Sequence, residues 1–314
     1  MKRLHAGILA LVSGVLSSGS VLAAGFGTYV LGTTGLKNGS MPPPGVYAIN
    51  LAFEYRATDF RNENGDRVSQ VNGEKFSGKA EARIDITSIT YVSKLTLFGA
   101  NYGARIAMLS GEANVEAHQG SEFMKQHVSG IGGLYLEPLN LSWHLPRFDF
   151  FTSYGLSREF FGPSDPNTVD IRWTHLFSAG MSAYLDAKHD WAFSIVPRFE
   201  FFQHDLLQDS KAGGDALAEW GLCRSFTFMN EDKKSPRFML DVGPVGYAEW
   251  QVLRGASSAP GPHPRFSVYA AGAEIGATVP KWHLARFTLR CEQEFFARSR
   301  PQGIVGAFRF SIKF

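Results

Sequence analysis

The sequence predicts an all-β protein, a transmembrane antiparallel β-barrel, and the two ends of the chain carry the main evidence. The last seven residues, Phe308 to Phe314, alternate strictly between apolar and polar side chains and finish on an aromatic residue. Alternation with a period of two predicts a strand with one apolar and one polar face. A terminal Phe on such a strand is typical of outer-membrane barrels, and we expect Phe314 to be recognised by the barrel-assembly machinery.

The first 23 residues have the features of a secretory signal peptide. Lys2 and Arg3 precede an apolar stretch from Ala6 to Leu16, and cleavage is expected after Ala23. This stretch is shorter than the ~20 residues that a membrane helix needs, and no other uncharged apolar stretch of that length follows. An exported chain of this kind can cross a membrane only as a closed barrel. We therefore expect it in the outer membrane of a Gram-negative bacterium, with outer-membrane lipid as a partner.

Composition agrees with this fold class and excludes others. The chain has 314 residues, a net charge of +2 and 44% hydrophobic residues, so no nucleic-acid partner is expected. The two cysteines form no disulfide framework. Residues 24–45 read as an N-terminal extension and residues 46–314 as the barrel.

Alternation persists along the chain and predicts which side chains face inward. In residues 46–56 the odd positions are large and apolar, whereas Glu54 and Arg56 lie on the other face. Charged faces recur in residues 79–88, 191–201 and 284–295. We assign the charged faces to the lumen, because an arginine against hydrocarbon costs about 2–4 kcal/mol. The residues expected to line the pore are Arg83, Asp85, Arg105, Arg198, Glu200, Glu249, Glu274, Arg286, Arg290 and Glu292.

The connections predict twelve strands, with fourteen as the alternative, and both termini on the periplasmic side. The strands are expected near residues 46–57, 79–92, 96–109, 132–145, 148–158, 171–185, 191–203, 215–229, 237–253, 265–279, 283–297 and 303–314. Long and short connections alternate, as in outer-membrane barrels. They are Asp59–Gly78 (long), Ser93–Lys94 (short), Ser110–Gly130 (long), Pro146–Arg147 (short), Phe161–Asp170 (longer) and Ala187–Asp190 (short).

Two further features concern the interior of the barrel. The Gly-rich, nearly uncharged extension up to Gly45 is too apolar for a simple tail, and we expect it to enter the periplasmic mouth as a partial plug. Its Pro42-Pro43-Pro44 stiffens it. Cys223 shares the inward face with Glu219, whereas Cys291 shares the lipid face with Leu289. Two free thiols are therefore expected.

Five segments resemble a known family. They are Pro42–Tyr47, Leu141–Asp149, Trp173–His175, Glu219–Leu222 and Gly243–Gln251. In order and spacing these segments are similar to the meta-pathway phenol-degradation family, the SphA-like outer-membrane transporters. The resemblance implies an outer-membrane barrel that passes small hydrophobic or aromatic molecules.

Three function classes follow. The first is a channel for small hydrophobic, aromatic or amphipathic substrates that diffuse passively through a polar lumen. The second is a structural or surface-recognition barrel acting through its outer loops. The third is a rim lipid hydrolase, because His127 and Ser129 have the His-x-Ser spacing of a barrel phospholipase. We expect no enzyme activity, no catalytic residues, no cofactor and no metal, since the histidines lack ligand spacing.

Overall fold

The computed structural model describes residues 29–159, 173–203, 213–231, 235–253 and 265–314. The expected signal peptide and the expected connection Phe161–Asp170 lie outside these residues. The strands are β1 (Gly45–Phe60), β2 (Gln70–Val71), β3 (Glu74–Leu97), β4 (Ala100–Gln119), β5 (Glu122–His144), β6 (Phe148–Glu159), β7 (Trp173–Tyr184), β8 (Trp191–Phe202), β9 (Gly213–Met229), β10 (Pro236–Leu253), β11 (Ser267–Val279), β12 (Ala285–Arg298) and β13 (Pro301–Lys313).

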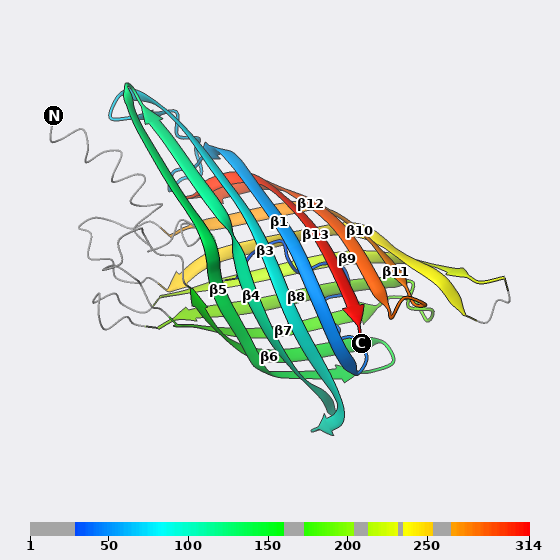
Figure 1. Cartoon of the computed structure of the whole chain (residues 1–314). Helices are drawn as coiled ribbons and strands as arrows, with labels where there is room; N and C mark the ends of the chain where they lie inside the picture. The colour runs from blue at the N-terminus through cyan, green and yellow to red at the C-terminus, as the bar shows by residue number, and fades with distance from the viewer. Residues whose placement is uncertain (1–28, 160–172, 204–212, 232–234, 254–264) are drawn as a thin grey trace.

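Twelve of these strands form a closed antiparallel barrel (Figure 1). Each strand pairs with the next in the chain, and β1 closes the ring by pairing with both β3 and β13. The two-residue β2 pairs only with β3 and lies outside the ring. The predicted twelve-stranded barrel is therefore confirmed, with one short extra strand. No helix in the described part of the chain is long and apolar enough to cross a bilayer.

The prediction of a long connection at Ser110–Gly130 is wrong. There, β4 and β5 continue as a paired hairpin to a tight turn at Ser121 and Gly120, which has a φ of 55°. The small and polar residues of this stretch read as a loop, yet Ala113 and Val115 are buried on its inner side. The turn expected at Ser93–Lys94 lies instead at Phe98 and Gly99, both with positive φ.

The faces expected for β1 and β3 are inverted. Leu51, Phe53 and Tyr55 of β1 are buried in one cluster with Val30 and Leu31, which precede the barrel in the chain. The inner face of β1 is therefore apolar. Glu54 and Arg83 lie opposite each other in the register, on the outer face.

The reason for this inversion is the length of the strands. A tilted strand crosses the hydrocarbon in roughly 9–11 residues, whereas β3, β4 and β5 have 24, 20 and 23 residues. Their far ends extend beyond the other strands (Figure 1). Charged side chains that point outward on these extensions do not contact hydrocarbon. The energetic cost of placing arginine against hydrocarbon, which was the reason for assigning the charged faces to the lumen, therefore does not apply to them. The inner face is covered by apolar contacts instead, such as the edge-to-face pair Phe60–Phe76, whose ring centroids are 5.7 Å apart.

The two ends of the barrel's chain meet at one rim. The backbone N–H of Phe314 donates to the carbonyl oxygen of Val46 at 2.8 Å, and the Phe314 side chain is exposed. Its recognition by the assembly machinery stays a prediction.

The cysteines confirm two of the predicted faces. Both are free, with Cys223 buried and Cys291 exposed, and Leu36 packs against Cys223 from inside the barrel.

We predict that in folded protein a membrane-permeant maleimide labels Cys291 and leaves Cys223 unlabelled. Cys223 should react only after denaturation, because its thiol is covered by Leu36. Peptide mass mapping after labelling checks this. Labelling of Cys223 in the folded state would show that the thiol is not covered.

Candidate functional site

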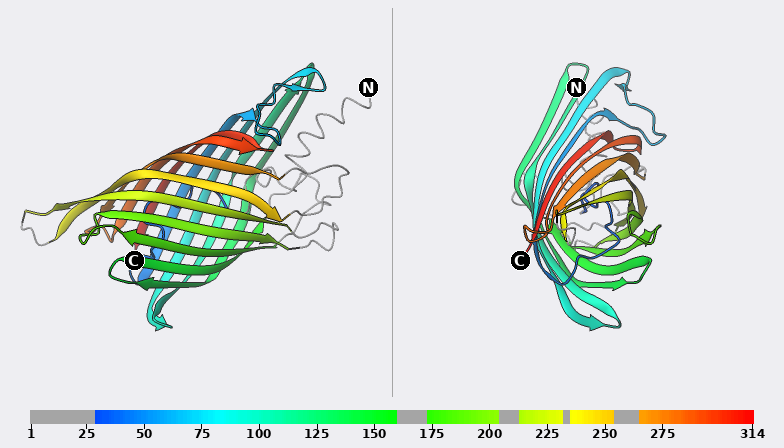
Figure 2. Two further views of the ribbon diagram at one scale, coloured as in Figure 1. Left: turned by 180° about the vertical axis from the view of Figure 1, so that it is seen from behind. Right: turned by 90° about the vertical axis from the view of Figure 1, so that its right-hand side faces the viewer.

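The candidate site is the barrel lumen together with the chain that precedes β1, here called the N-terminal segment (residues 29–44). In the right-hand view of Figure 2 this blue chain lies within the ring of strands. Its side chains and backbone contact β6 and β8–β11. Contacts to strands on several sides place the segment inside the barrel.

Glu219 of β9 holds the middle of the segment. One carboxylate oxygen accepts the backbone N–H groups of Gly32 at 2.9 Å and Thr34 at 3.1 Å. The other accepts the Tyr29 hydroxyl at 2.8 Å and the Arg198 guanidinium at 2.8 Å. Arg198 also lies over the Tyr29 ring, 4.3 Å from its centroid. One carboxylate therefore joins the segment to the charges of the wall.

Neighbouring carboxylates hold the segment in the same way. The backbone N–H of Tyr29 donates to Glu200 at 2.6 Å, and that of Leu36 donates to Glu274 at 3.2 Å. The carbonyl oxygen of Thr34 accepts a hydrogen bond from Arg290. These contacts use the backbone of the segment, so they depend on its path more than on its side chains.

The end of the segment nearer β1 is fixed by side chains. Lys37 Nζ lies 3.3 Å from the Asp241 carboxylate and 2.5 Å from the Ser225 hydroxyl. Further along, the Ser40 hydroxyl donates to Asp149 at 2.5 Å. Asp149 also accepts the Tyr184 hydroxyl at 2.5 Å. This rim of the lumen thus anchors the segment firmly.

Two glycines allow the segment to approach the wall. Gly32 has a φ of 77°, in the left-handed region that favours glycine. At Gly39 a Cβ atom would lie 2.0 Å from backbone atoms of Met181. The Gly-rich composition of the segment follows from this close fit.

The wall behind the segment is a network of ion pairs on β8–β12 and the turn that follows. Arg290 pairs with Glu292 at 2.7 Å, and Arg286 pairs with Asp241 at 2.6 Å. Arg300 bridges Glu249 at 2.9 Å and Glu294 at 3.2 Å. Buried carboxylates and guanidinium groups are stable only when paired in this way.

The opposite wall is mainly apolar. It consists of the inner faces of β1, β3, β4 and β13, with Phe53, Ile84 and Val305 among its buried residues. Arg105 on β4 and Arg309 on β13 also lie on these inner faces. The lumen therefore has one side rich in ion pairs and one side that is mainly apolar.

The structure brings eight of the ten predicted lining residues to the inner face. Arg198 and Glu200 lie on β8, Glu249 on β10 and Glu274 on β11. The remaining four are Arg105 on β4 and Arg286, Arg290 and Glu292 on β12. Whether they line a conducting path stays a prediction.

Arg83 and Asp85 are not in the lumen. Arg83 lies in register with Glu54 on one side and Glu112 on the other. This row continues through Gly306 to Cys291 on the outer face. The assignment of both residues to the pore is wrong, for the reason of strand length given above.

The ten expected pore-lining residues do not include several inner residues that matter most, although Glu219 had been placed on the inward face together with Cys223. The omitted residues are Asp149, Asp215, Glu219, Asp241, Glu294 and Arg300. Glu219 and Asp241 could have been included. The alternation of side chains places each of them on the same face of its strand as a residue already assigned inward, Cys223 on β9 and Glu249 on β10. No local pattern indicated Arg300, because it lies in the turn between β12 and β13.

The His-x-Ser pair has one contact expected of a catalytic triad. His127 Nδ1 lies 2.7 Å from Asn114 Oδ1 on the neighbouring strand, and Ser129 lies two residues further on the same exposed face. No hydrogen bond joins Ser129 to His127 among the contacts of the described residues. In those same residues, no three His, Cys, Asp or Glu side chains are placed to hold a metal ion.

Large apolar side chains, among them Ile89, Phe177 and Leu289, are exposed on the outer face of the barrel. A closed twelve-stranded antiparallel barrel with such an apolar outer face defines the class of the protein. It is an outer-membrane β-barrel of the kind found in Gram-negative bacteria. The family model described as "Putative MetA-pathway of phenol degradation" matches residues 59–310, and the chain belongs to that family. This confirms the resemblance seen in the sequence.

Solved structures share the fold at low identity. The COG4313 outer membrane channel from Pseudomonas putida F1 is 14% identical, with a TM-score of 0.65, and the match covers 88% of this chain and 98% of that one. The β domain of the Bordetella autotransporter BrkA is 10% identical, with a TM-score of 0.47 over 86% of this chain and 100% of that one. A comparison with curated proteins found no match.

We predict that Glu219→Gln lowers the free energy of unfolding by about 3 kcal/mol, because the buried Arg198 loses its charge partner. Denaturant unfolding in detergent micelles measures the change. Glu116→Gln is the matched control. Lys125 donates to Glu116 at the exposed end of the β4–β5 hairpin, and this hydrogen bond lowers the pKa of the Glu116 carboxyl. Exposed pairs contribute little, so the control should leave the midpoint unchanged. Equal effects would contradict the anchoring role of Glu219.

Proposed function

We propose that the protein is an outer-membrane channel that admits small hydrophobic, aromatic or amphipathic molecules by passive diffusion. Family membership supports a role in handling such compounds. The observation that carries the proposal is the lumen itself, with a charged wall facing an apolar one. A barrel with a purely structural role has no need of an interior that separates the two.

The N-terminal segment is proposed as the plug of this channel. Apart from its continuation into β1, it is held to the walls by hydrogen bonds, ion pairs and apolar packing, and its backbone contacts with Glu200, Glu219 and Glu274 can be exchanged for water. Displacing the segment would uncover both the carboxylates and the apolar face of β1. Opening would thus expose a solute to both walls at once.

The proposal for the plug predicts that deleting residues 29–40 raises single-channel conductance in planar bilayers. In the same variant Cys223 should become reactive toward a small water-soluble maleimide, because Leu36 no longer covers it. Heat-modified migration on gels verifies that the barrel is folded. Unchanged conductance together with a reactive Cys223 would show that the segment covers the wall without closing the channel.

The proposal for the lumen predicts that Arg286→Ala and Arg290→Ala together shift the ion selectivity of the deletion variant toward cations. Removing two inner cations leaves the carboxylates of Asp241, Glu274 and Glu292 in excess. Reversal potentials in a salt gradient measure the shift. Arg83→Ala is the matched control, since Arg83 lies on the outer face, and it should leave the reversal potential unchanged. A shift of equal size in the control would remove the basis for the lining assignment.

Two alternatives remain testable with the same preparations. The projecting β3–β5 sheet supports surface recognition as a second candidate, and binding without conductance would favour it. Lipid hydrolysis by pure protein, lost in Ser129→Ala, would favour the rim hydrolase, for which the His127–Asn114 contact is the supporting observation.

A further inference from the structure

The outer face of the barrel changes from apolar to charged at one level on three adjacent strands. On β3 the outward side chains Ile89 and Tyr91 are followed, toward the far end, by Thr87, Asp85 and Arg83. The same change occurs on β4 after Met108 and on β5 before Ile131.

This level marks the edge of the hydrocarbon. Residues 87–97 of β3 and 100–110 of β4 are about the length that a tilted strand needs to cross it, roughly 9–11 residues. Arg83 and Glu112 lie immediately beyond these stretches, at the level of the lipid head groups.

One row of residues in register connects this level to the hydrocarbon. It runs from Glu112 through Arg83, Glu54 and Gly306 to Cys291. Because the strands are tilted, the row descends along the barrel. Glu112 is twelve residues past the start of β4, whereas Cys291 is only six residues past the start of β12.

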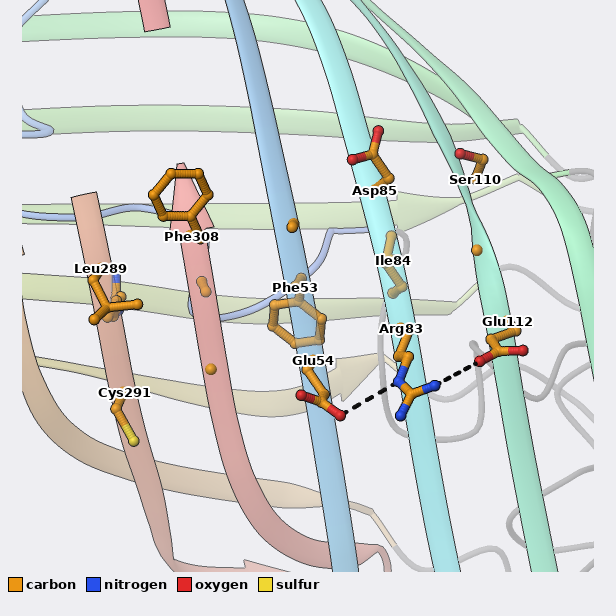
Figure 3. Close-up of a pocket in the computed structure, with 15 residues that line it drawn as sticks. Phe53, Glu54, Arg83, Ile84, Asp85, Ser110, Glu112, Leu289, Cys291 and Phe308 are labelled. Atoms are coloured by element: carbon orange, nitrogen blue, oxygen red, sulfur yellow. Dashed lines mark hydrogen bonds and ion pairs between the residues drawn. The ribbon is translucent and has the colours of Figure 1, made fainter. Parts of the chain in front are cut away.

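A recess of about 730 Å³ lies along this row, within the size range of small-molecule sites. Small residues, Ala52 and Gly306, form its centre. Leu289 and Phe308, 60% and 46% exposed, border it on the deeper side. Figure 3 shows these apolar side chains apart from the charged row of Glu54, Arg83 and Glu112. The recess is therefore amphipathic.

The charged part of the recess presents both signs. Arg83 lies 3.4 Å from Glu54 and 3.3 Å from Glu112, and all three side chains are 40–64% exposed. Asp85 adds a third carboxylate to the lining. The arginine is thus shared between two acids and keeps donors for a further acceptor, since a guanidinium carries five N–H groups.

We propose that this recess binds one lipid of the outer leaflet, whose head group carries phosphates bridged by divalent cations. Arg83 donates to a phosphate, while Glu54 and Glu112 each share a cation with the phosphates beside it. The acyl chain runs down the row over Gly306 toward Leu289 and Cys291. A head group of mixed charge complements a rim of mixed charge, in which Arg56 also pairs with Glu54 at 2.6 Å. A purely anionic head group would be repelled by three carboxylates that only two arginines offset.

Cys291 provides the reporter for the test. Purified protein is placed in phosphatidylcholine vesicles with or without lipopolysaccharide and Mg²⁺, and labelling of Cys291 by a membrane-permeant maleimide is followed by peptide mapping. The thiol reacts only in the unoccupied fraction, so lipopolysaccharide at ten times its dissociation constant should slow labelling about tenfold. Chelating Mg²⁺ should restore the rate.

The triple variant Glu54→Gln, Arg83→Gln, Glu112→Gln should label equally fast in both kinds of vesicle. The control variant Glu116→Gln, Lys125→Gln removes a pair further out on β4 and β5 and should keep the protection. Folding of each variant is checked by heat-modified migration. Equal rates for the unmodified protein in both vesicles, protection that survives in the triple variant, or protection that is insensitive to chelation would each overturn the proposal.

Discussion

A carboxylate sealed inside a barrel must be paired, and this constraint organises the interior of the protein. Glu219 meets it by sharing one oxygen between two backbone N–H groups and the other between Tyr29 and Arg198. Partners come from two sources, the wall and the N-terminal segment. The wall therefore depends on the segment for part of its hydrogen bonding, and the segment depends on the wall for its path.

The same constraint explains why polarity is divided unequally around the ring. Most of the buried acids lie on β8 to β12, and these strands, together with the turn after β12, also carry the arginines that neutralise them, so charge is balanced locally. The strands on the opposite side mainly bury Phe, Tyr and small aliphatic side chains, in one cluster with Val30 and Leu31 of the segment, so they need few counter-charges. The difference between the charged wall and the mainly apolar wall thus follows from where arginines are available to balance buried carboxylates.

Much of the fold was readable from alternation alone. The strand count and the inward faces of β8, β9 and β12 follow from strict period-two patterns with arginine and glutamate on one side. For β1 and β3 the pattern was equally clear, but its interpretation needed the depth of each residue in the bilayer. Sequence shows that Arg83 and Ile84 face opposite ways; it does not show that Arg83 stands beyond the hydrocarbon, since the long hairpins read as loops.

The lumen residues were harder to predict than the fold. Arg198 and Arg290 stand in alternating strands, and their inward direction was evident. Asp149 and Arg300 are placed by a turn or by contacts with residues far away in the chain, such as Ser40 and Glu249. Such partners are brought together only when the barrel closes, and a short stretch of sequence carries no information about which distant residues will then be neighbours.

The N-terminal segment continues without a linker into β1 at Gly45. A ligand joined so closely to its own receptor has an effective concentration of roughly millimolar, and its release is followed by recapture rather than by escape. A solute that competes for Glu219 or for the apolar face of β1 must act against this local excess at every encounter. In the proposed channel, the segment would therefore compete with every solute for the same surfaces, and the length and stiffness of its connection to β1 would set the threshold for entry as much as the chemistry of the walls.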